Sequence, residues 1–187
     1  MKTYTVIGGV NGVGKSTLSG VLSVTDYSMG IIVDPDKLIK ISGDRLKGGK
    51  AALELISSCL ENNSDFSQET TLSGKGILKT LQAARKRGYY VRLYYVGLSS
   101  AEESLSRIAN RVKKGGHDIP REDVTRRFKR RFEDLLKILP FCDEACFFDN
   151  ENGFVYVGEY KDGKLYDAVK DLPEWFTEMK MYYEGVK

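Results

Sequence analysis

A glycine-rich segment near the start of the chain has the residue types of a phosphate-binding loop. It reads Gly-Val-Asn-Gly-Val-Gly-Lys-Ser and fits the pattern G-x-x-x-x-G-K-[ST]. Glycines let the backbone fold around an anion and aim N–H groups at it, and a following helix adds a positive partial charge. The spacing predicts that Lys15 reaches the β- and γ-phosphates of a nucleoside triphosphate and that the Ser16 hydroxyl binds Mg²⁺. The residues of this segment predicted to bind the nucleotide are Gly9, Val10, Asn11, Gly12, Val13, Gly14, Lys15, Ser16 and Thr17.

Acidic side chains follow the second and third predicted strands. Asp34 and Asp36 come after the run Gly-Ile-Ile-Val, and Glu69 precedes a pair of threonines. In an open α/β sheet the carboxyl ends of such strands face the bound ligand, so a carboxylate there can accept the proton of an attacking hydroxyl. One of the two aspartates is expected to serve only the turn around Pro35. A cap or a surface acid is the alternative for Glu69.

Positive charge is concentrated in one segment of the chain. Residues 107–131 hold ten Lys/Arg and three Asp/Glu, a balance of +7, whereas the whole chain carries +3. On a wheel for the helix expected there, Arg127 and Arg131 flank the apolar stripe, and Arg126 and Arg130 lie on its far side. Arginines on a lid helix would stabilise a transferring phosphoryl group, because the planar guanidinium binds two oxygens at once. A solvated basic face is the alternative for any one of them.

Strand and helix patterns alternate along the chain. The predicted strands are 4–8, 30–34, 65–69, 89–97 and 145–149. The predicted helices are 15–22, 44–60, 74–87, 101–112 and 120–139, with a further helix from Pro173. Turn signals at Asn152-Gly153 and Asp162-Gly163, next to the runs FVYVGEY and KLY, predict a hairpin formed by these two runs.

This alternation predicts an α/β fold with three layers, α/β/α, around a mostly parallel sheet of about five strands. We expect a single domain over residues 1–187. Its arginine-rich lid would lie at about 111–139, and its C-terminal hairpin and helix at about 151–187. The strand at 89–97 ends in Gly-Leu-Ser-Ser, without the acid that motor and transporter ATPases usually carry there.

The composition excludes several classes of protein. Hydrophobic residues make up 41% and charged residues 29%, which is typical of a globular chain, and no apolar run is long enough to span a membrane. Three cysteines and the lack of a secretory signal predict a cytoplasmic protein. The single histidine, His117, follows two glycines at the expected hinge, where it would contact substrate or phosphate, or serve in capping or packing.

Several motifs together indicate a family. They occur in the order GGVNGVGKST, VDPD, ETTLSGKG, RVKKGGHDIP, RRFKRRFEDL and FDN, and cover roughly residues 3–150. The chain resembles the zeta-toxin-like P-loop kinases, specifically their short bacterial branch. The resemblance implies a P-loop kinase fold and use of ATP or GTP with Mg²⁺. Better-studied zeta toxins phosphorylate the sugar 3′-hydroxyl of UDP-N-acetylglucosamine, so a nucleotide sugar is the implied substrate and an antitoxin protein the implied partner.

The resemblance also implies a role for individual residues. Asp36 resembles the general base, and Lys15 and Ser16 resemble the nucleotide and Mg²⁺ ligands. Glu69 and Thr71 are similar to the family's Glu-x-Thr element, which positions substrate, and His117 is grouped with them. The residues that resemble the phosphate-contacting arginines are Arg111, Arg127 and Arg130, with Arg126 as a substitute. Asn150 of the FDN motif is expected near the nucleotide base.

The motifs favour a small-molecule kinase but leave its substrate open. The chain is shorter than the longer zeta toxins and has Asp-Pro-Asp where short members usually have an Asn-Ala-Asp type of sequence. A kinase of a nucleotide cofactor such as NAD would use the same site. The alternative of a different class is an NTP-dependent switch, ATPase or binding module that acts on nucleic acid or a protein. Only the basic segment supports this alternative. We expect neither nucleic acid nor a membrane as the main partner.

Overall fold

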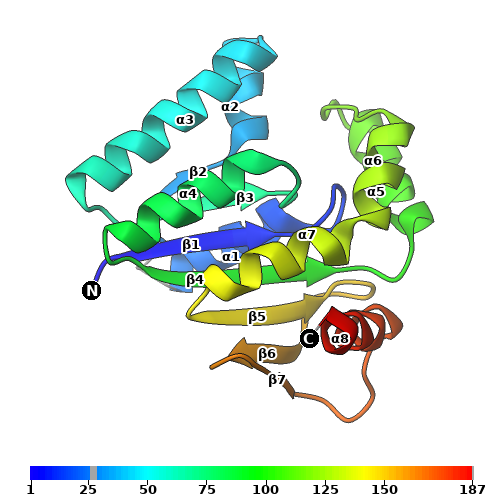
Figure 1. Ribbon diagram of the computed structural model, residues 1–187. Helices are drawn as coiled ribbons and strands as arrows, with labels where there is room; N and C mark the ends of the chain where they lie inside the picture. Colours follow the sequence, from blue (N-terminus) through cyan, green and yellow to red (C-terminus); the bar gives the residue numbers. More distant parts are fainter. Residues whose placement is uncertain (26–28, 187) are drawn as a thin grey trace.

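The computed structural model describes residues 1–25 and 29–186 and is built around one twisted sheet (Figure 1). Its strands are β1 Thr3–Gly8, β2 Ile31–Val33, β3 Phe66–Thr70, β4 Tyr90–Gly97, β5 Glu144–Asp149, β6 Val155–Lys161 and β7 Lys164–Asp167. Its α-helices are α1 Lys15–Thr25, α2 Pro35–Ser42, α3 Arg45–Asn62, α4 Lys75–Lys86, α5 Ala101–Lys113, α6 Arg121–Lys129, α7 Arg131–Ile138 and α8 Glu174–Val186. Within the described residues, no helix is long and apolar enough to cross a membrane.

The predicted parallel α/β sheet is confirmed, but its strand count was too low. The order is β2-β3-β1-β4-β5-β6-β7, in which the first five strands are parallel and the last two antiparallel. The two additional strands are the hairpin that the turn signals predicted. Asp162 and Gly163 both have positive φ, 51° and 74°, as a tight hairpin turn requires, and the hairpin extends the sheet beyond β5.

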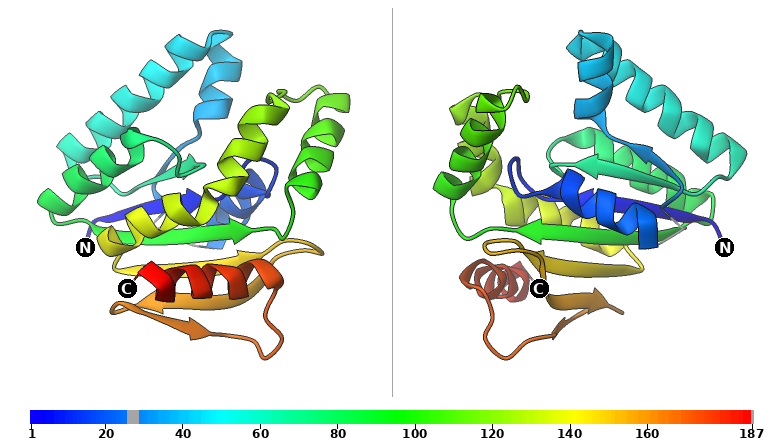
Figure 2. Two further views of the ribbon diagram at one scale, coloured as in Figure 1. Left: turned by 45° about the vertical axis from the view of Figure 1, so that its right-hand side comes forward. Right: turned by 180° about the vertical axis from the view of Figure 1, so that it is seen from behind.

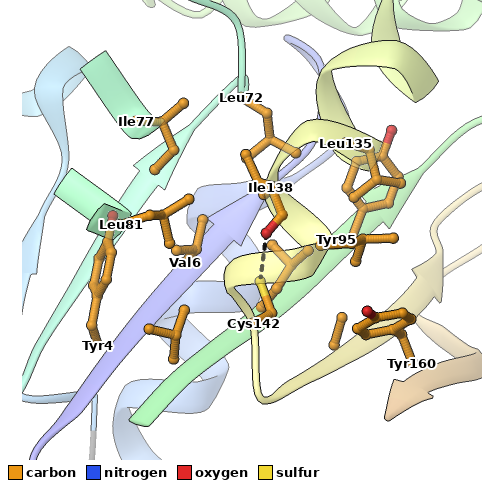
Figure 3. Packing of buried hydrophobic residues seen from close by; sticks show 14 of the residues in the cluster. Tyr4, Val6, Leu72, Ile77, Leu81, Tyr95, Leu135, Ile138, Cys142 and Tyr160 are labelled. Carbon is orange, nitrogen blue, oxygen red and sulfur yellow. Dashed lines mark hydrogen bonds between the residues drawn. The ribbon is translucent and has the colours of Figure 1, made fainter. Parts of the chain in front are cut away.

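Helices cover both faces of the sheet. Helices α3, α4, α7 and α8 lie on one face and α1 on the other (Figure 2). The main core forms on the first face, where Val6 of β1 and Tyr95 of β4 pack against Leu81, Leu135 and other helical side chains (Figure 3). A smaller cluster joins α1 to the phosphate-binding segment and contains Val10, Val13, Leu18, Val96, Leu98 and Phe128.

The helix predicted over 120–139 is in fact two helices. The backbone breaks at Arg130, which has φ −97° and ψ 3° and ends α6 as it begins α7. The reason lies in the packing: Phe128 belongs to the small cluster beside α1, whereas Phe132 and Leu135 belong to the main core. One straight helix would keep Phe128, Phe132 and Leu135 on a single apolar stripe. The break lets Phe128 pack in the small cluster while the other two pack in the main core.

Helix α2 was not predicted from the sequence. Asp34 caps its first turn, Pro35 fits its first position, and Gly43 ends it with φ 65°. None of its residues is fully buried, and its 8 residues are too few for apolar periodicity to identify a helix. It packs against α3, where Gly48 leaves room for the backbone of Ile39. The α2–α3 pair and the α5–α6 pair form two projections beside the sheet (Figure 2).

Candidate active site

The segment between β1 and α1 folds as a phosphate-binding loop. Gly9, Gly12 and Gly14 have φ values of 141°, 80° and 99°, which side-chain-bearing residues rarely adopt. There is also no room for larger residues: a Cβ on Gly9 would lie 2.4 Å from the Val96 carbonyl oxygen, and one on Gly14 would lie 2.6 Å from Asn150 Nδ2. The loop therefore requires glycine at these positions and holds its backbone N–H groups at the start of α1.

Lys15 is half-buried at the centre of this loop. Its Nζ donates hydrogen bonds of 2.9 Å to the carbonyl oxygens of Gly9 and Val10. Burial lowers the pKa of Lys15 to about 8, although the nearby Glu69 and Asp36 carboxylates oppose the shift. The ammonium is thus poorly solvated and bound by two neutral carbonyl oxygens. A phosphate, which is charged, would be a stronger partner for it than these carbonyls are.

Glu69 lies next to Ser16 and also lines the open part of the site. Ser16 Oγ donates to Glu69 Oε2 at 2.7 Å, and Ser19 Oγ donates to the other carboxylate oxygen. Burial raises the pKa of Glu69, and the two serine hydrogen bonds oppose that shift. The carboxylate is therefore placed beside the hydroxyl predicted to hold Mg²⁺.

The two aspartates after β2 have different surroundings. Asp34 Oδ1 accepts hydrogen bonds from the backbone N–H groups of Asp36, at 3.0 Å, and Lys37, at 3.2 Å, and so caps α2. This is the turn chemistry expected for one of the pair. Asp36 lies in the first turn of α2, is exposed, and lines two cavities.

Those two cavities meet at the phosphate-binding loop. The first, of about 290 Å³, lies between α2–α3 and the segment from His117 to Arg127, and we call it the outer cavity. The second, of about 180 Å³, lies over the loop itself and includes Ser16 and Arg111; we call it the loop cavity. The residues that line both are Asn11, Lys15, Asp36 and Glu69.

Two of the predicted arginines reach these cavities. Arg127 of α6 lines the outer cavity, and its Nη1 donates to Asn11 Oδ1 at 2.7 Å. Arg111 of α5 lines the loop cavity, and its Nη2 donates to the His117 carbonyl oxygen at 2.7 Å. Within the described residues, the Nε atoms of both guanidinium groups are buried without a hydrogen-bond partner.

Arg130 and Arg126 do not join the site. Arg130 Nε lies 3.4 Å from a carboxylate oxygen of Glu133, and Arg126 pairs with Asp123 at 2.6 Å. Neither arginine lines either cavity. The break makes Arg130 the residue before the first turn of α7, where its side chain pairs with Glu133. The structure does not bring Arg130 to the two cavities, and a contact of Arg130 with the phosphates stays a prediction.

The remaining predicted residues surround the site. Thr71 and His117 line the outer cavity, and the Thr71 hydroxyl contacts Ser73 Oγ at 2.7 Å. Asn150 follows β5, and its Nδ2 donates to the Val13 carbonyl oxygen at 2.7 Å. Asn150 therefore holds the loop through Val13, and its expected place near the nucleotide base stays a prediction.

The sequence analysis missed Arg45, Arg107 and Ser19. Arg45 begins α3 and lines the outer cavity, and Ser19 binds Glu69. Arg107 lines the loop cavity, and its Nη2 donates to the carbonyl oxygens of Asn150, at 2.7 Å, and Glu151, at 3.1 Å. One signal was available for Arg107, since it lies four residues before Arg111 on the same helical face.

A third cavity lies between the C-terminal part of α5 and Lys40 of α2. It has a volume of about 420 Å³, and we call it the basic cavity. None of the described residues that line it is acidic; they are Lys40, Arg107, Asn110, Arg111, Lys114, Gly115 and Gly116. Such a surface attracts anions.

The residues present fit a nucleoside triphosphate with Mg²⁺. The loop glycines, Lys15 and the guanidinium group of Arg111 supply donors around the loop cavity. Ser16 and Glu69 would hold the ion, because Mg²⁺ in such sites uses one or two protein oxygens together with substrate phosphates and water. Among the described residues, no cluster of three His, Cys, Asp or Glu side chains forms a metal site independent of the nucleotide.

Structural comparison gives the same picture of the fold. A chain from the PezAT chromosomal toxin-antitoxin system of Streptococcus pneumoniae superposes with a TM-score of 0.64 at 16% identity, covering 99% of this chain and 85% of that one. A chain of the AvrRxo1-ORF1:-ORF2 structure with ATP superposes with a TM-score of 0.66 at 18% identity, covering 100% of this chain. This chain spans 63% of that AvrRxo1 chain.

Sequence comparison identifies the family. A protein of Haemophilus influenzae, described as uncharacterized, is 36% identical over 126 residues, which are 64% of this chain and 88% of the relative. The family model for zeta toxin matches residues 47–170, about two thirds of the chain, and this range contains Glu69, Arg111 and Arg127. With the phosphate-binding loop preceding that range in its expected place, the chain belongs to the zeta toxin family of P-loop kinases.

Proposed function

We propose that this protein transfers the γ-phosphoryl group of ATP to a hydroxyl group of a small molecule, with Asp36 as the general base. The observation that carries the proposal is the position of Asp36, which lines both the loop cavity and the outer cavity. A base must reach the acceptor hydroxyl and the transferring phosphorus together, and the junction of the two cavities is where both would lie.

The side chains around that junction have complementary roles in this proposal. The Asp36 carboxylate accepts the proton as the acceptor oxygen attacks phosphorus and the bond to the leaving ADP oxygen breaks. Lys15 and Arg127 stabilise the charge on the equatorial oxygens, which is the main contribution a protein makes to phosphoryl transfer. Arg111 contacts the nucleotide phosphates from the α5 side of the loop cavity.

ATP, or GTP in its place, is the proposed donor, with Mg²⁺ held at Ser16 and Glu69. The AvrRxo1 neighbour contains ATP, which supports ATP for this chain. Mg²⁺ would neutralise phosphate charge when bound. The exposed carboxylate of Asp36 is left free of it, because Glu69 is the acid that contacts the Ser16 hydroxyl.

A nucleotide sugar such as UDP-N-acetylglucosamine is the proposed acceptor. The family resemblance supports this class, and so does the distribution of charge. The outer cavity of about 290 Å³ has the size of a small ligand site and presents Thr71, His117 and Arg45 to the acceptor. The neighbouring basic cavity offers cations for a diphosphate.

The proposal is tested by the product. Purified protein is incubated with radiolabelled γ-³²P-ATP, Mg²⁺ and one acceptor at a time: UDP-N-acetylglucosamine, UDP-glucose, free N-acetylglucosamine or NAD. The expected result is a labelled UDP-N-acetylglucosamine phosphate and little label on the free sugar. Labelled NAD would assign the protein to the cofactor kinases, and label on none of the four would contradict the proposed acceptor class.

An antitoxin-like protein partner is proposed on the same grounds. The PezAT neighbour is part of a toxin-antitoxin system, and AvrRxo1-ORF1 is found with AvrRxo1-ORF2. If the activity harms its host, expression should arrest growth, Lys15→Met should relieve the arrest, and a neighbouring gene should relieve it without mutation. Growth unaffected by active protein would argue against this partner.

A further inference from the structure

Helix α8 lies beyond the residues that match the family model, yet it is firmly packed against the sheet (Figure 2). Trp175 and Phe176 are buried, and Trp175 Nε1 donates to Asp149 Oδ1 at 2.8 Å. Glycines in the sheet make this packing feasible: a Cβ on Gly97 would lie 2.3 Å from the Trp175 ring, and one on Gly158 would lie 2.5 Å from the Phe176 ring. The helix thus has a fixed position relative to β4 and β6.

One side chain of α8 holds an arginine at the break between α6 and α7. Glu178 Oε2 accepts a hydrogen bond of 2.8 Å from Arg131 Nη2. The Arg131 guanidinium lies 4.0 Å from the ring centroids of both Phe128 and Phe132, and the side chain is only 13% exposed. A buried guanidinium between two rings and a carboxylate has little freedom to move.

Arg131 also contacts the backbone at the break. Its Nη1 donates to the Phe128 carbonyl oxygen at 3.0 Å, at the C-terminal end of α6, where the backbone N–H of Arg130 donates to the same oxygen. Phe128 directly follows Arg127, whose guanidinium contacts Asn11 in the phosphate-binding loop. A continuous chain of contacts therefore runs from Glu178 through Arg131 and Phe128 to Arg127.

We propose that Arg131 and Glu178 are positioning residues that hold the end of α6 so that Arg127 faces the transferring phosphoryl group. The inference rests on the proposed function, because it assigns Arg127 to that group. An arginine that stabilises a transition state must be placed to within a fraction of an ångström, and a displaced α6 would lose that placement without unfolding the protein. The C-terminal helix is then part of the catalytic apparatus although it contacts no ligand.

The test measures binding of Mg·ADP·aluminium fluoride, which mimics the transferring phosphoryl group and contains no acceptor. Arg127→Ala should weaken this binding about 100-fold. Arg131→Gln and Glu178→Gln should each weaken it about tenfold while leaving Mg·ADP affinity within about twofold. Because both act through Arg127, neither should weaken binding further in the Arg127→Ala background.

Lys180→Gln is the matched control. Lys180 lies on the same helix and pairs with Asp167 of β7, away from α6, so its loss should leave binding of the mimic unchanged. The fluorescence of Trp175, the single tryptophan, reports whether α8 stays packed in each variant.

The result that would overturn the inference is an equal loss in both backgrounds, or no loss in Arg131→Gln and Glu178→Gln. Wild-type affinity for the mimic in Arg127→Ala would overturn it as well, since no arginine would then need positioning. Failure of UDP-N-acetylglucosamine as acceptor would contradict the proposed acceptor and leave these affinities unchanged, so the two failures are distinguishable.

Discussion

The phosphate-binding loop and the arginine-bearing helices beside it are built in contrasting ways. The loop comes from one stretch, residues 9–17, and holds itself in place through buried Val10 and Val13 and the glycine backbone. Arg111 and Arg127 come from two helices and reach the site through contacts with other segments. The first region is encoded locally and the second depends on tertiary packing. Their sensitivity to mutation should differ accordingly.

The largest effect is expected within the loop. Lys15→Met should lower the rate of phosphoryl transfer about 10³-fold, because it removes the ammonium that would bind the β- and γ-phosphates. The fold should not suffer, since burial lowers the pKa of Lys15 and the substitution removes a charge that is costly to bury. Radiolabelled transfer assays and thermal unfolding measure the two properties. A variant that is active but less stable would show that Lys15 is structural.

Substitution of arginines in the basic segment should have a smaller effect on the rate of transfer, and the size of that effect should differ between Arg127 and Arg130. Arg127→Ala should slow transfer about 100-fold, because Arg127 lines the outer cavity at the loop. Arg130→Ala should change the rate by less than about twofold, since Arg130 lines neither cavity and pairs with Glu133 and the buried Asp134 of α7. Turnover under saturating ATP compares the two. Equal losses would mean that α6 and α7 straighten when ligand binds.

The pH dependence of ATP binding sharpens the comparison further. Burial lowers the pKa of Lys15 in the free protein to about 8. Affinity for Mg·ATP should therefore fall about tenfold from about pH 7 to about pH 9, as the free protein loses the Lys15 ammonium and binding must take up a proton. Titration calorimetry in buffers of different ionisation enthalpy detects that proton. An affinity that stays flat over this range would contradict the account.

The local origin of the loop explains why the sequence predicts it and misses other features. The strand, the glycines, the lysine and the start of the helix all lie within a few residues of one another, so a sequence pattern is enough to predict the loop. The break at Arg130 depends on Phe128 and Phe132 packing into separate clusters, which periodicity does not reveal. The sequence of α2 contains a capping aspartate and a proline at the start of the helix, but its 8 residues are too short a run for periodicity to predict a helix.

The same reasoning applies to the candidate site. The sequence indicates that one of Asp34 and Asp36 serves a turn, but only the hydrogen bonds to Asp34 decide which. A helical wheel places Arg127 on a flank of the apolar stripe and Arg130 on its far side, yet it does not say which of these positions faces the loop. Glu69 was expected at the substrate, and its contact with Ser16 is a tertiary fact that spacing along the chain does not contain.

The central claim is that Asp36 is the base at the junction of the two cavities, and a pair of aspartate variants tests it most directly. Single-turnover transfer of the γ-phosphoryl group is measured for Asp36→Asn and Asp34→Asn, with UDP-N-acetylglucosamine or the acceptor that the panel identifies. Asp36→Asn should slow transfer about 10³-fold with Mg·ATP affinity within about twofold. Asp34→Asn should retain its rate, because asparagine caps a helix as well as aspartate does. Full activity in Asp36→Asn, or an equal loss in Asp34→Asn, would contradict the claim.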